Sequence, residues 1–222
     1  MANSKIIVFD MDGVLVDPTQ SYRRTVVETV AGFGGAITLA EIEDYKNQGG
    51  WNNDWALVEQ ILADQDCPAS YADIQLAFNF LFHGPDGYVM QEEWLVSEGL
   101  LDRLAARHQL GIFTGRLQAD ALHTLNRFAP GITFGPQICA EDVINGKPAP
   151  DGLQKIQQMH PDREIIFLGD TVDDARSARL AGVPFYGIAK ADHLRRAELV
   201  RLFEEEQALG VFNTVNELEA FV

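Results

Sequence analysis

Two carboxylates spaced i and i+2 stand near the start of the chain, where Asp10 and Asp12 are followed by Gly13. The four residues before them, 6–9, are apolar and rich in β-branched types, which is typical of a buried strand. In an extended segment both carboxylates leave the same side of the backbone, and Gly13 allows a tight turn behind them. Acids held this close raise one pKa or recruit a cation. The pair is therefore an acid/base pair, a metal site, or both, unless it is only an Asp-Gly turn.

A hydroxyl and a lysine follow at comparable positions further along the chain. The apolar run before Thr114-Gly115-Arg116 predicts a strand, so that Thr114 and free backbone N–H groups lie at its carboxyl end and suit an oxyanion. Thr114 alone also fits a simple turn or cap. Lys147 lies in a loop stiffened by two prolines, which suits a fixed charge aimed at a phosphoryl oxygen, although an isolated loop lysine is ordinarily solvated.

A third group of acids follows another strand pattern. Asp170 ends the strand, and Asp173 and Asp174 fall in the first turn of the next helix, where the helix dipole already favours acids. Asp170, in contrast, would join Asp10 and Asp12 in an oxygen-rich cluster, the ligand set that Mg²⁺ prefers. Three carboxylates at one edge of a sheet require a cation.

The elements that must position these residues are short strands alternating with helices. From about residue 98 onward this alternation predicts parallel βαβ units, whereas residues 18–91 show only helices and loops. We expect an α/β core from residues 1–17 and 92–222, with a small helical domain, residues 18–91, inserted after the first strand. Ligands bind at the carboxyl ends of strands in such sheets, and the inserted domain, which emerges there, is expected to act as a lid. Strands are expected at 6–9, 110–114, 132–139, 165–169 and 183–188, with an edge strand at 211–212, and helices at 21–33, 38–45, 55–64, 71–82, 100–108, 119–128, 151–159, 173–181, 194–209 and 217–221.

The overall charge limits the partners. With 17 Lys and Arg against 33 Asp and Glu, the formal net charge of −16 repels nucleic acid and anionic membranes, so we expect neither as a partner. A small phosphorylated ligand would need a metal ion or a local lysine to reverse the field. The two cysteines lack CxxC spacing, and neither a signal sequence nor a membrane-length apolar run is present, so a cytoplasmic protein is expected.

Four motifs together resemble a known family. Asp10-x-Asp12-Gly13, Thr114-Gly115, Lys147-Pro148 and Gly169-Asp170-x-x-x-Asp174 are similar, in order, to the motifs of the haloacid dehalogenase superfamily. The likeness runs from residue 6 to about 187 and is greatest to the phosphatase branch with a helical cap after the first motif, the phosphoglycolate phosphatase and β-phosphoglucomutase-like proteins. It implies a Rossmann-like core with a parallel sheet and a cap domain.

The resemblance also implies catalytic roles. Asp10 would attack phosphorus and form an aspartyl-phosphate, while Asp12 would protonate the leaving oxygen and then deprotonate the hydrolytic water. Thr114 and the N–H of Gly115 would hold phosphoryl oxygens, and Lys147 would neutralise their charge.

The implied cofactor is Mg²⁺. It would lie between Asp10, the backbone carbonyl of Asp12, and Asp170, with Asp174 acting through a water or by orienting Lys147. Asp12 argues against dehalogenation and phosphonate hydrolysis, because family members with those activities typically lack this second acid.

Substrate contacts outside these motifs are less defined. By resemblance, the segment from Lys46 to Trp55 is a specificity loop in the cap, with Lys46, Gly50 and Asn52 as candidate substrate-binding residues. An amide-rich turn that caps the helix at Trp55 explains the same residues. Arg116 either contacts substrate phosphate or pairs with a neighbouring acid.

The sequence thus predicts a Mg²⁺-dependent phosphatase for a small phosphorylated metabolite, as a monomer or homodimer. The alternatives are a phosphomutase of the β-phosphoglucomutase type and a non-catalytic module that binds a phosphorylated ligand.

Overall fold

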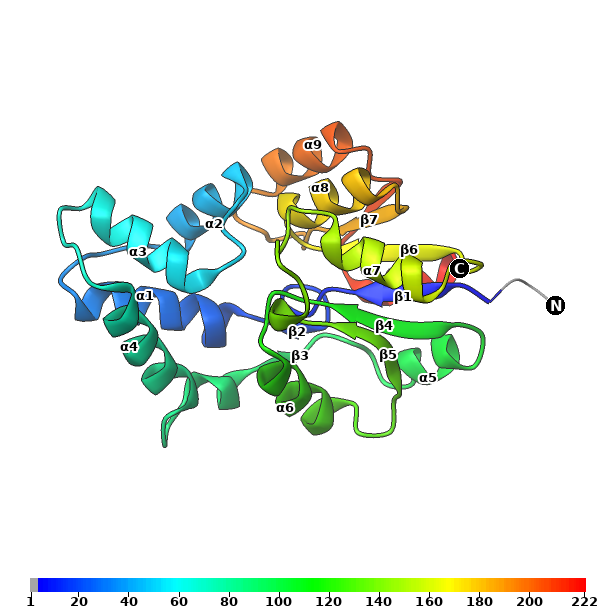
Figure 1. Cartoon of the computed structure of the whole chain (residues 1–222), viewed down its shortest axis with the longest axis horizontal. Helices are drawn as coiled ribbons and strands as arrows, with labels where there is room; N and C mark the ends of the chain where they lie inside the picture. The colour runs from blue at the N-terminus through cyan, green and yellow to red at the C-terminus, as the bar shows by residue number, and fades with distance from the viewer. Residues whose placement is uncertain (1–3) are drawn as a thin grey trace. The chain divides into compact units, whose positions relative to one another are not determined.

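The chain divides into two compact units in a computed structural model that describes residues 4–222 (Figure 1). The first unit comprises residues 1–16 and 94–222, and the second comprises residues 17–93. The sequence placed these boundaries at 17/18 and 91/92, and the expected start of the core at residue 1 falls on residues 1–3, which lie outside the described part. None of the helices within residues 4–222 has both the length and the apolar character needed to cross a membrane.

The first unit is built on a parallel sheet. Its strand order is β5-β4-β1-β6-β7-β8, and β1 pairs along its whole length with β4 on one side and β6 on the other. The α/β fold with a parallel sheet is therefore confirmed. The strands are β1 (Ile6–Phe9), β4 (Gln109–Phe113), β5 (Phe134–Ile138), β6 (Ile165–Gly169), β7 (Phe185–Ile188) and β8 (Gly210–Phe212).

Alternate residues of β1 are buried on opposite faces of this sheet. Ile7 and Phe9 belong to one apolar cluster with helices α5 and α6, whereas Ile6 and Val8 belong to another with helices α7, α8 and α9. Because both faces are covered, the strand is a continuous apolar run rather than an alternating one. Figure 1 shows these two helical layers on either side of the strands. The helices are α5 (Leu100–Ala105), α6 (Gln118–Phe128), α7 (Asp151–Met159), α8 (Val172–Ala181) and α9 (Arg196–Glu205).

The direction of strand addition reverses beside β1. From β1 the chain passes to β4 and β5 on one side and then returns to add β6, β7 and β8 on the other. The connection that leaves β1 therefore runs toward β4, and the connection that leaves the neighbouring β6 runs the other way, toward β7. Ligands bind at such a switch point in open parallel sheets. The carboxyl ends of β1, β4 and β6 carry Asp10, Thr114 and Asp170 respectively.

Several predicted elements differ at their ends. The predicted helix 194–209 is shorter, as α9. In place of the predicted helix 217–221 there is a 3₁₀ helix, Val215–Ala220. The predicted helix 21–33 begins with a π-helical turn, Thr19–Arg23, before α1 (Arg24–Gly32). Apolar spacing identified these segments, but it does not distinguish the tighter and wider helical turns at their ends.

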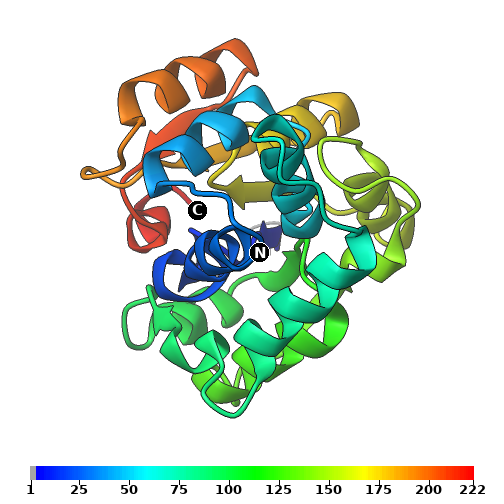
Figure 2. The ribbon, with the colours of Figure 1, turned by 90° about the vertical axis from the view of Figure 1, so that its left-hand side faces the viewer.

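The second unit is helical (Figure 2). Its buried apolar residues form a core of their own. Besides α1 it contains α2 (Leu39–Gln48), α3 (Asp54–Asp64) and α4 (Tyr71–His83), followed by a 3₁₀ turn, Tyr88–Gln91. Side chains cap three of these helices at Thr38, Asn53 and Ser70, as their residue types favour. Short strands β2 (Val16–Asp17) and β3 (Glu93–Trp94) pair where the chain passes between the units.

Candidate active site

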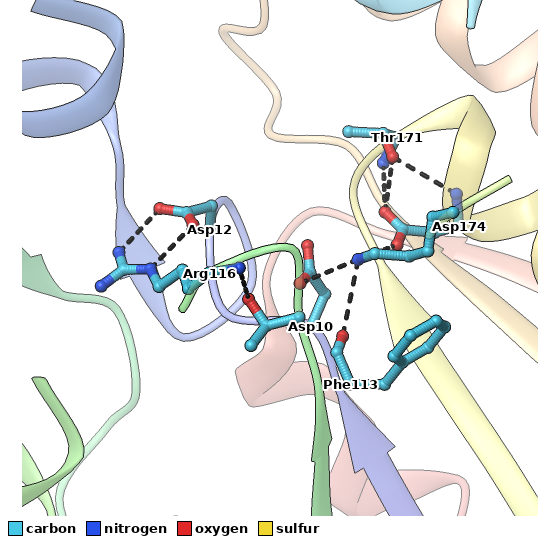
Figure 3. Close-up of polar contacts among 8 residues, drawn as sticks. Asp10, Asp12, Phe113, Arg116, Thr171 and Asp174 are labelled. Carbon is cyan, nitrogen blue, oxygen red and sulfur yellow. Dashed lines mark hydrogen bonds and ion pairs between the residues drawn. The ribbon is translucent and has the colours of Figure 1, made fainter. Parts of the chain in front are cut away.

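A buried lysine lies between two buried carboxylates at the carboxyl edge of the sheet. The Nζ atom of Lys147 is 3.0 Å from Oδ1 of Asp10 and 2.6 Å from Oδ1 of Asp174, and it also donates a 3.5 Å hydrogen bond to the carbonyl of Phe113 (Figure 3). The lysine side chain is 1% exposed, so water does not screen these contacts. Asp10 and Lys147, which are 137 positions apart in the sequence, thus belong to one charged centre with Asp174.

Burial and charge act in opposite directions on this centre. Burial, together with the nearby Asp174 and Asp12 carboxylates, raises the pKa of Asp10 to about 7, although Lys147 acts to lower it. Burial favours a neutral Lys147, but the charges of Asp10 and Asp174 outweigh it and raise the pKa of this lysine. Asp10 therefore needs more positive charge than one lysine supplies to be fully ionised near neutral pH.

A helix cap fixes Asp174. Thr171 is the N-cap of α8, and its backbone N–H and hydroxyl donate to Oδ2 of Asp174 at 3.0 and 2.6 Å. The other oxygen of Asp174 contacts Lys147 at 2.6 Å, and the expected role of this acid in orienting the lysine stays a prediction. Thr171 is not among the predicted site residues, although the pattern Thr171-x-x-Asp174 is the signature of a capping box.

Three carboxylates could hold a cation here. Asp10, Asp170 and Asp174 each offer an oxygen, and these ligand atoms lie within 4.8 Å of one another. An all-carboxylate oxygen set suits a hard divalent cation, and such a cation would supply the positive charge that Asp10 lacks. The residues present therefore fit a divalent metal ion. Asp173, which shares the first turn of α8 with Asp174, is buried but does not belong to this cluster.

Gly13 makes room for Asp170. A Cβ atom at Gly13 would lie 1.8 Å from Oδ2 of Asp170, and the φ angle of Gly13 is +72°, in the left-handed region. Only glycine combines this backbone conformation with so close an approach of a carboxylate.

Replacing Gly13 with alanine is therefore expected to displace Asp170. Gly182 provides a matched control, because it has a similar φ of +68° but nothing within 4 Å of its added Cβ. We expect Gly182→Ala to lower the free energy of unfolding by about 1 kcal/mol through backbone strain alone. Gly13→Ala should cost about 3 kcal/mol and weaken divalent-metal binding, because overpacking adds to the strain. Denaturant unfolding and metal titration of both variants measure this difference, and equal effects would contradict it.

Asp12 forms an ion pair with Arg116 and not with Lys147. Its Oδ1 and Oδ2 accept hydrogen bonds of 2.8 and 2.9 Å from Nη2 and Nε of Arg116. Of the two alternatives for Arg116, the structure thus shows the ion pair with a neighbouring acid. The expected alternation of Asp10 and Asp12 along one extended segment is wrong, because β1 ends at Phe9 and a tight turn follows, with Gly13 donating to the carbonyl of Val16 at 2.8 Å.

Thr114 lies at the end of β4, where its backbone N–H donates to the carbonyl of Ile138 at 3.0 Å. Its hydroxyl accepts a 3.2 Å hydrogen bond from the backbone N–H of Arg116, so the Thr114-Gly115-Arg116 turn folds back on the hydroxyl. Both Thr114 and Arg116 are buried. Thr114 therefore lies beside the same sheet edge as Asp10, as the sequence predicted.

Within the second unit, Lys46 is paired rather than solvated. Its Nζ donates to the backbone carbonyl of Trp51 at 2.6 Å and to Oδ1 of Asp54 at 2.7 Å. Gly50 and Asn52 lie in the segment between α2 and α3, and Asn53 caps α3 by accepting from two backbone N–H groups. The amide-rich turn thus has the structural role that the sequence offered as an alternative. Substrate binding by Lys46, Gly50 and Asn52 stays a prediction.

Comparison with known proteins identifies the family. A model of haloacid dehalogenase-like hydrolases matches residues 7–188. The chain belongs to this family, as the four motifs indicated.

Individual relatives differ in how much of them the chain covers. It is 32% identical over 197 residues to an imidazoleglycerol-phosphate dehydratase of Phytophthora nicotianae, an alignment that covers 82% of this chain but only 42% of that protein. The chain therefore spans less than half the length of that relative. A phosphoglycolate phosphatase of Cereibacter sphaeroides is 26% identical over 183 residues, which cover 81% of this chain and 82% of the relative.

Solved structures share the fold. A phosphonoacetaldehyde hydrolase-like protein from Oleispira antarctica has a TM-score of 0.76 at 18% identity, covering 99% of this chain and 91% of the other. A conserved haloacid dehalogenase-like protein from Agrobacterium tumefaciens has a TM-score of 0.74 at 20% identity, covering 98% and 96%.

Proposed function

We propose that this protein is a Mg²⁺-dependent phosphatase that hydrolyses a small phosphorylated metabolite through an aspartyl-phosphate. The observation that carries the proposal is the buried centre in which Asp10 contacts Lys147 beside Asp170 and Asp174. The similarity of the chain to phosphoglycolate phosphatases also supports phosphatase activity. A module that only binds a phosphorylated ligand gains nothing from a nucleophile, Asp10, and a separate acid, Asp12.

In the first half of the reaction, an oxygen of Asp10 attacks phosphorus as the bond from phosphorus to the leaving oxygen breaks. Asp12 gives that oxygen a proton, so that an alcohol leaves. Thr114 and the N–H of Gly115 hold the phosphoryl oxygens at the end of β4, and Lys147 stabilises their charge.

In the second half, water attacks the phosphorus of the aspartyl-phosphate. Asp12, now ionised, takes a proton from this water, and the bond from phosphorus to Asp10 breaks. Inorganic phosphate forms, and Asp10 returns as a carboxylate and Asp12 as an acid. Proton and charge therefore balance over the cycle without another reactant.

Asp10, Asp170 and the backbone carbonyl of Asp12 would hold Mg²⁺, with Asp174 close by. When bound, this ion keeps Asp10 ionised and supplies positive charge to the phosphoryl group. Such local positive charge is needed because the chain as a whole carries −16 and repels phosphate esters.

The test is release of inorganic phosphate from a panel of phosphomonoesters that includes phosphoglycolate, sugar phosphates and 4-nitrophenyl phosphate. We expect release by the wild type in Mg²⁺ and none in EDTA, since Asp10 then lacks its second cation. Asp170→Asn should raise the Mg²⁺ concentration for half-maximal activity at least about tenfold, as loss of a metal-site ligand does.

The control is Asp162→Asn, which makes the same change at an exposed loop position of the same unit. It should leave activity and its Mg²⁺ dependence unchanged. Equal release with and without EDTA would contradict the metal requirement. Transfer of phosphate to a second hydroxyl of the substrate, with none released to water, would replace the phosphatase by a phosphomutase.

A further inference from the structure

Arg116 forms a bidentate ion pair with the Asp12 carboxylate. Both oxygens of Asp12 accept from the guanidinium, at 2.8 Å from Nη2 and 2.9 Å from Nε. The Arg116 side chain is 1% exposed, against 27% for Asp12. Parallel hydrogen bonds from a planar fork fix the plane of a carboxylate as well as its position, which a lysine cannot do.

The arginine itself is anchored on three sides. Its Nη1 donates to the hydroxyl of Thr124 on α6 at 2.8 Å, its backbone N–H donates to the hydroxyl of Thr114, and its backbone carbonyl accepts from Ala140 at 3.0 Å. The fork is therefore rigidly connected to the end of β4, where Thr114 lies. Any rotation of Asp12 away from this geometry breaks at least one of its two contacts with the buried guanidinium.

Asp12 and Asp10 thus form ion pairs with two different basic side chains. Figure 3 shows the contacts between Asp12 and Arg116 on one side of Asp10, and the contacts of Asp174 on the other. Lys147 binds Asp10 and Asp174, whereas Arg116 binds Asp12. A cation that contacts only the proton-transferring acid can orient it without neutralising the nucleophile.

We propose that Arg116 is a positioning residue for Asp12. When Asp12 is ionised, both of its oxygens accept from Arg116, and this is the orientation from which it takes a proton from water. When one oxygen carries the proton that goes to the leaving oxygen, that contact is released and the other oxygen still accepts from the guanidinium, so that the orientation stays tied to Thr114. This inference rests on the proposed function, because it assumes that Asp12 transfers protons during phosphomonoester hydrolysis.

Leaving-group dependence tests this role. 4-Nitrophenolate leaves without a proton, whereas the alkoxides of phosphoglycolate and glycerol 3-phosphate need one, so only the alkyl esters depend on a well-placed acid. The measured quantity is kcat/KM, which reports the first half of the reaction. We expect Arg116→Met to lower kcat/KM for the alkyl phosphates at least about tenfold more than for 4-nitrophenyl phosphate, since general acid catalysis contributes about 10²–10⁴-fold.

Three further variants separate positioning from folding. Arg127→Met makes the same change at an exposed position of α6 and should leave both substrates unaffected. Arg116→Lys keeps the charge but loses the fork, and it should keep most of the discrimination between substrates seen in Arg116→Met. Thr124→Val removes one anchor of the arginine and should shift the same ratio in the same direction by a smaller factor.

A double-mutant cycle gives an independent readout. If Arg116 acts through Asp12, then Arg116→Met should lower activity toward 4-nitrophenyl phosphate no further in an Asp12→Asn background. Equal losses on alkyl and aryl phosphates, a gain of activity, or full rescue by lysine would overturn the proposal. If the wild type releases phosphate from none of these esters, the proposed function fails rather than the role of Arg116.

Discussion

Asp10→Asn is expected to abolish phosphate release, by about 10⁴-fold or more, because it removes the nucleophile rather than one of several supporting groups. The amide has nearly the same volume and cannot form an acyl phosphate by the same attack. Incubation with a phosphorus-labelled substrate, followed by acid quench and mass spectrometry, should detect a modified Asp10 in the wild type and no modification in the variant.

The variant should remain folded. Burial already raises the pKa of Asp10 to about 7, so an uncharged side chain at this position is compatible with the fold. Asp174 still accepts from Lys147 at 2.6 Å, so the lysine keeps a partner. We therefore expect a melting temperature close to that of the wild type. Activity within tenfold of the wild type would mean that another residue attacks phosphorus.

Lys147→Met should be damaging to both stability and activity. It leaves Asp10 and Asp174 buried without the cation that contacts both of them, and removal of one partner from a buried ion pair costs about 3–5 kcal/mol. Phosphate release should fall by about 10²–10³-fold, since the charge that stabilises the phosphoryl oxygens is lost. Denaturant unfolding in EDTA measures the first effect, and kcat measures the second.

Mg²⁺ and an exposed lysine provide the controls. A bound divalent cation would replace part of the missing charge, so the loss of stability should be smaller in Mg²⁺ than in EDTA. Lys155→Met removes a half-exposed lysine of α7 that pairs with Asp142 at 3.5 Å, and it should cost less than about 1 kcal/mol. If Lys147→Met is as stable as Lys155→Met, the buried carboxylates do not depend on Lys147.

The sequence alone determined the elements and the chemical groups. Apolar runs bounded by turn residues predicted all six strands of the sheet, and the residues at their ends predicted an anionic cluster with a nearby lysine. These features are local, because burial pattern, helix spacing and turn chemistry depend on neighbours within a few residues of the chain.

The tertiary structure alone decided which groups meet. The order of the strands puts β1 between β4 and β6, and this order brings Asp10 to Lys147 rather than leaving it paired with Asp12. It also brings Arg116, 104 residues away, to Asp12. Contacts of this kind depend on strand order and on buried side-chain packing, neither of which has a local signature in the sequence. The sequence therefore determined which chemistry is available, and the fold decided how the charges are paired.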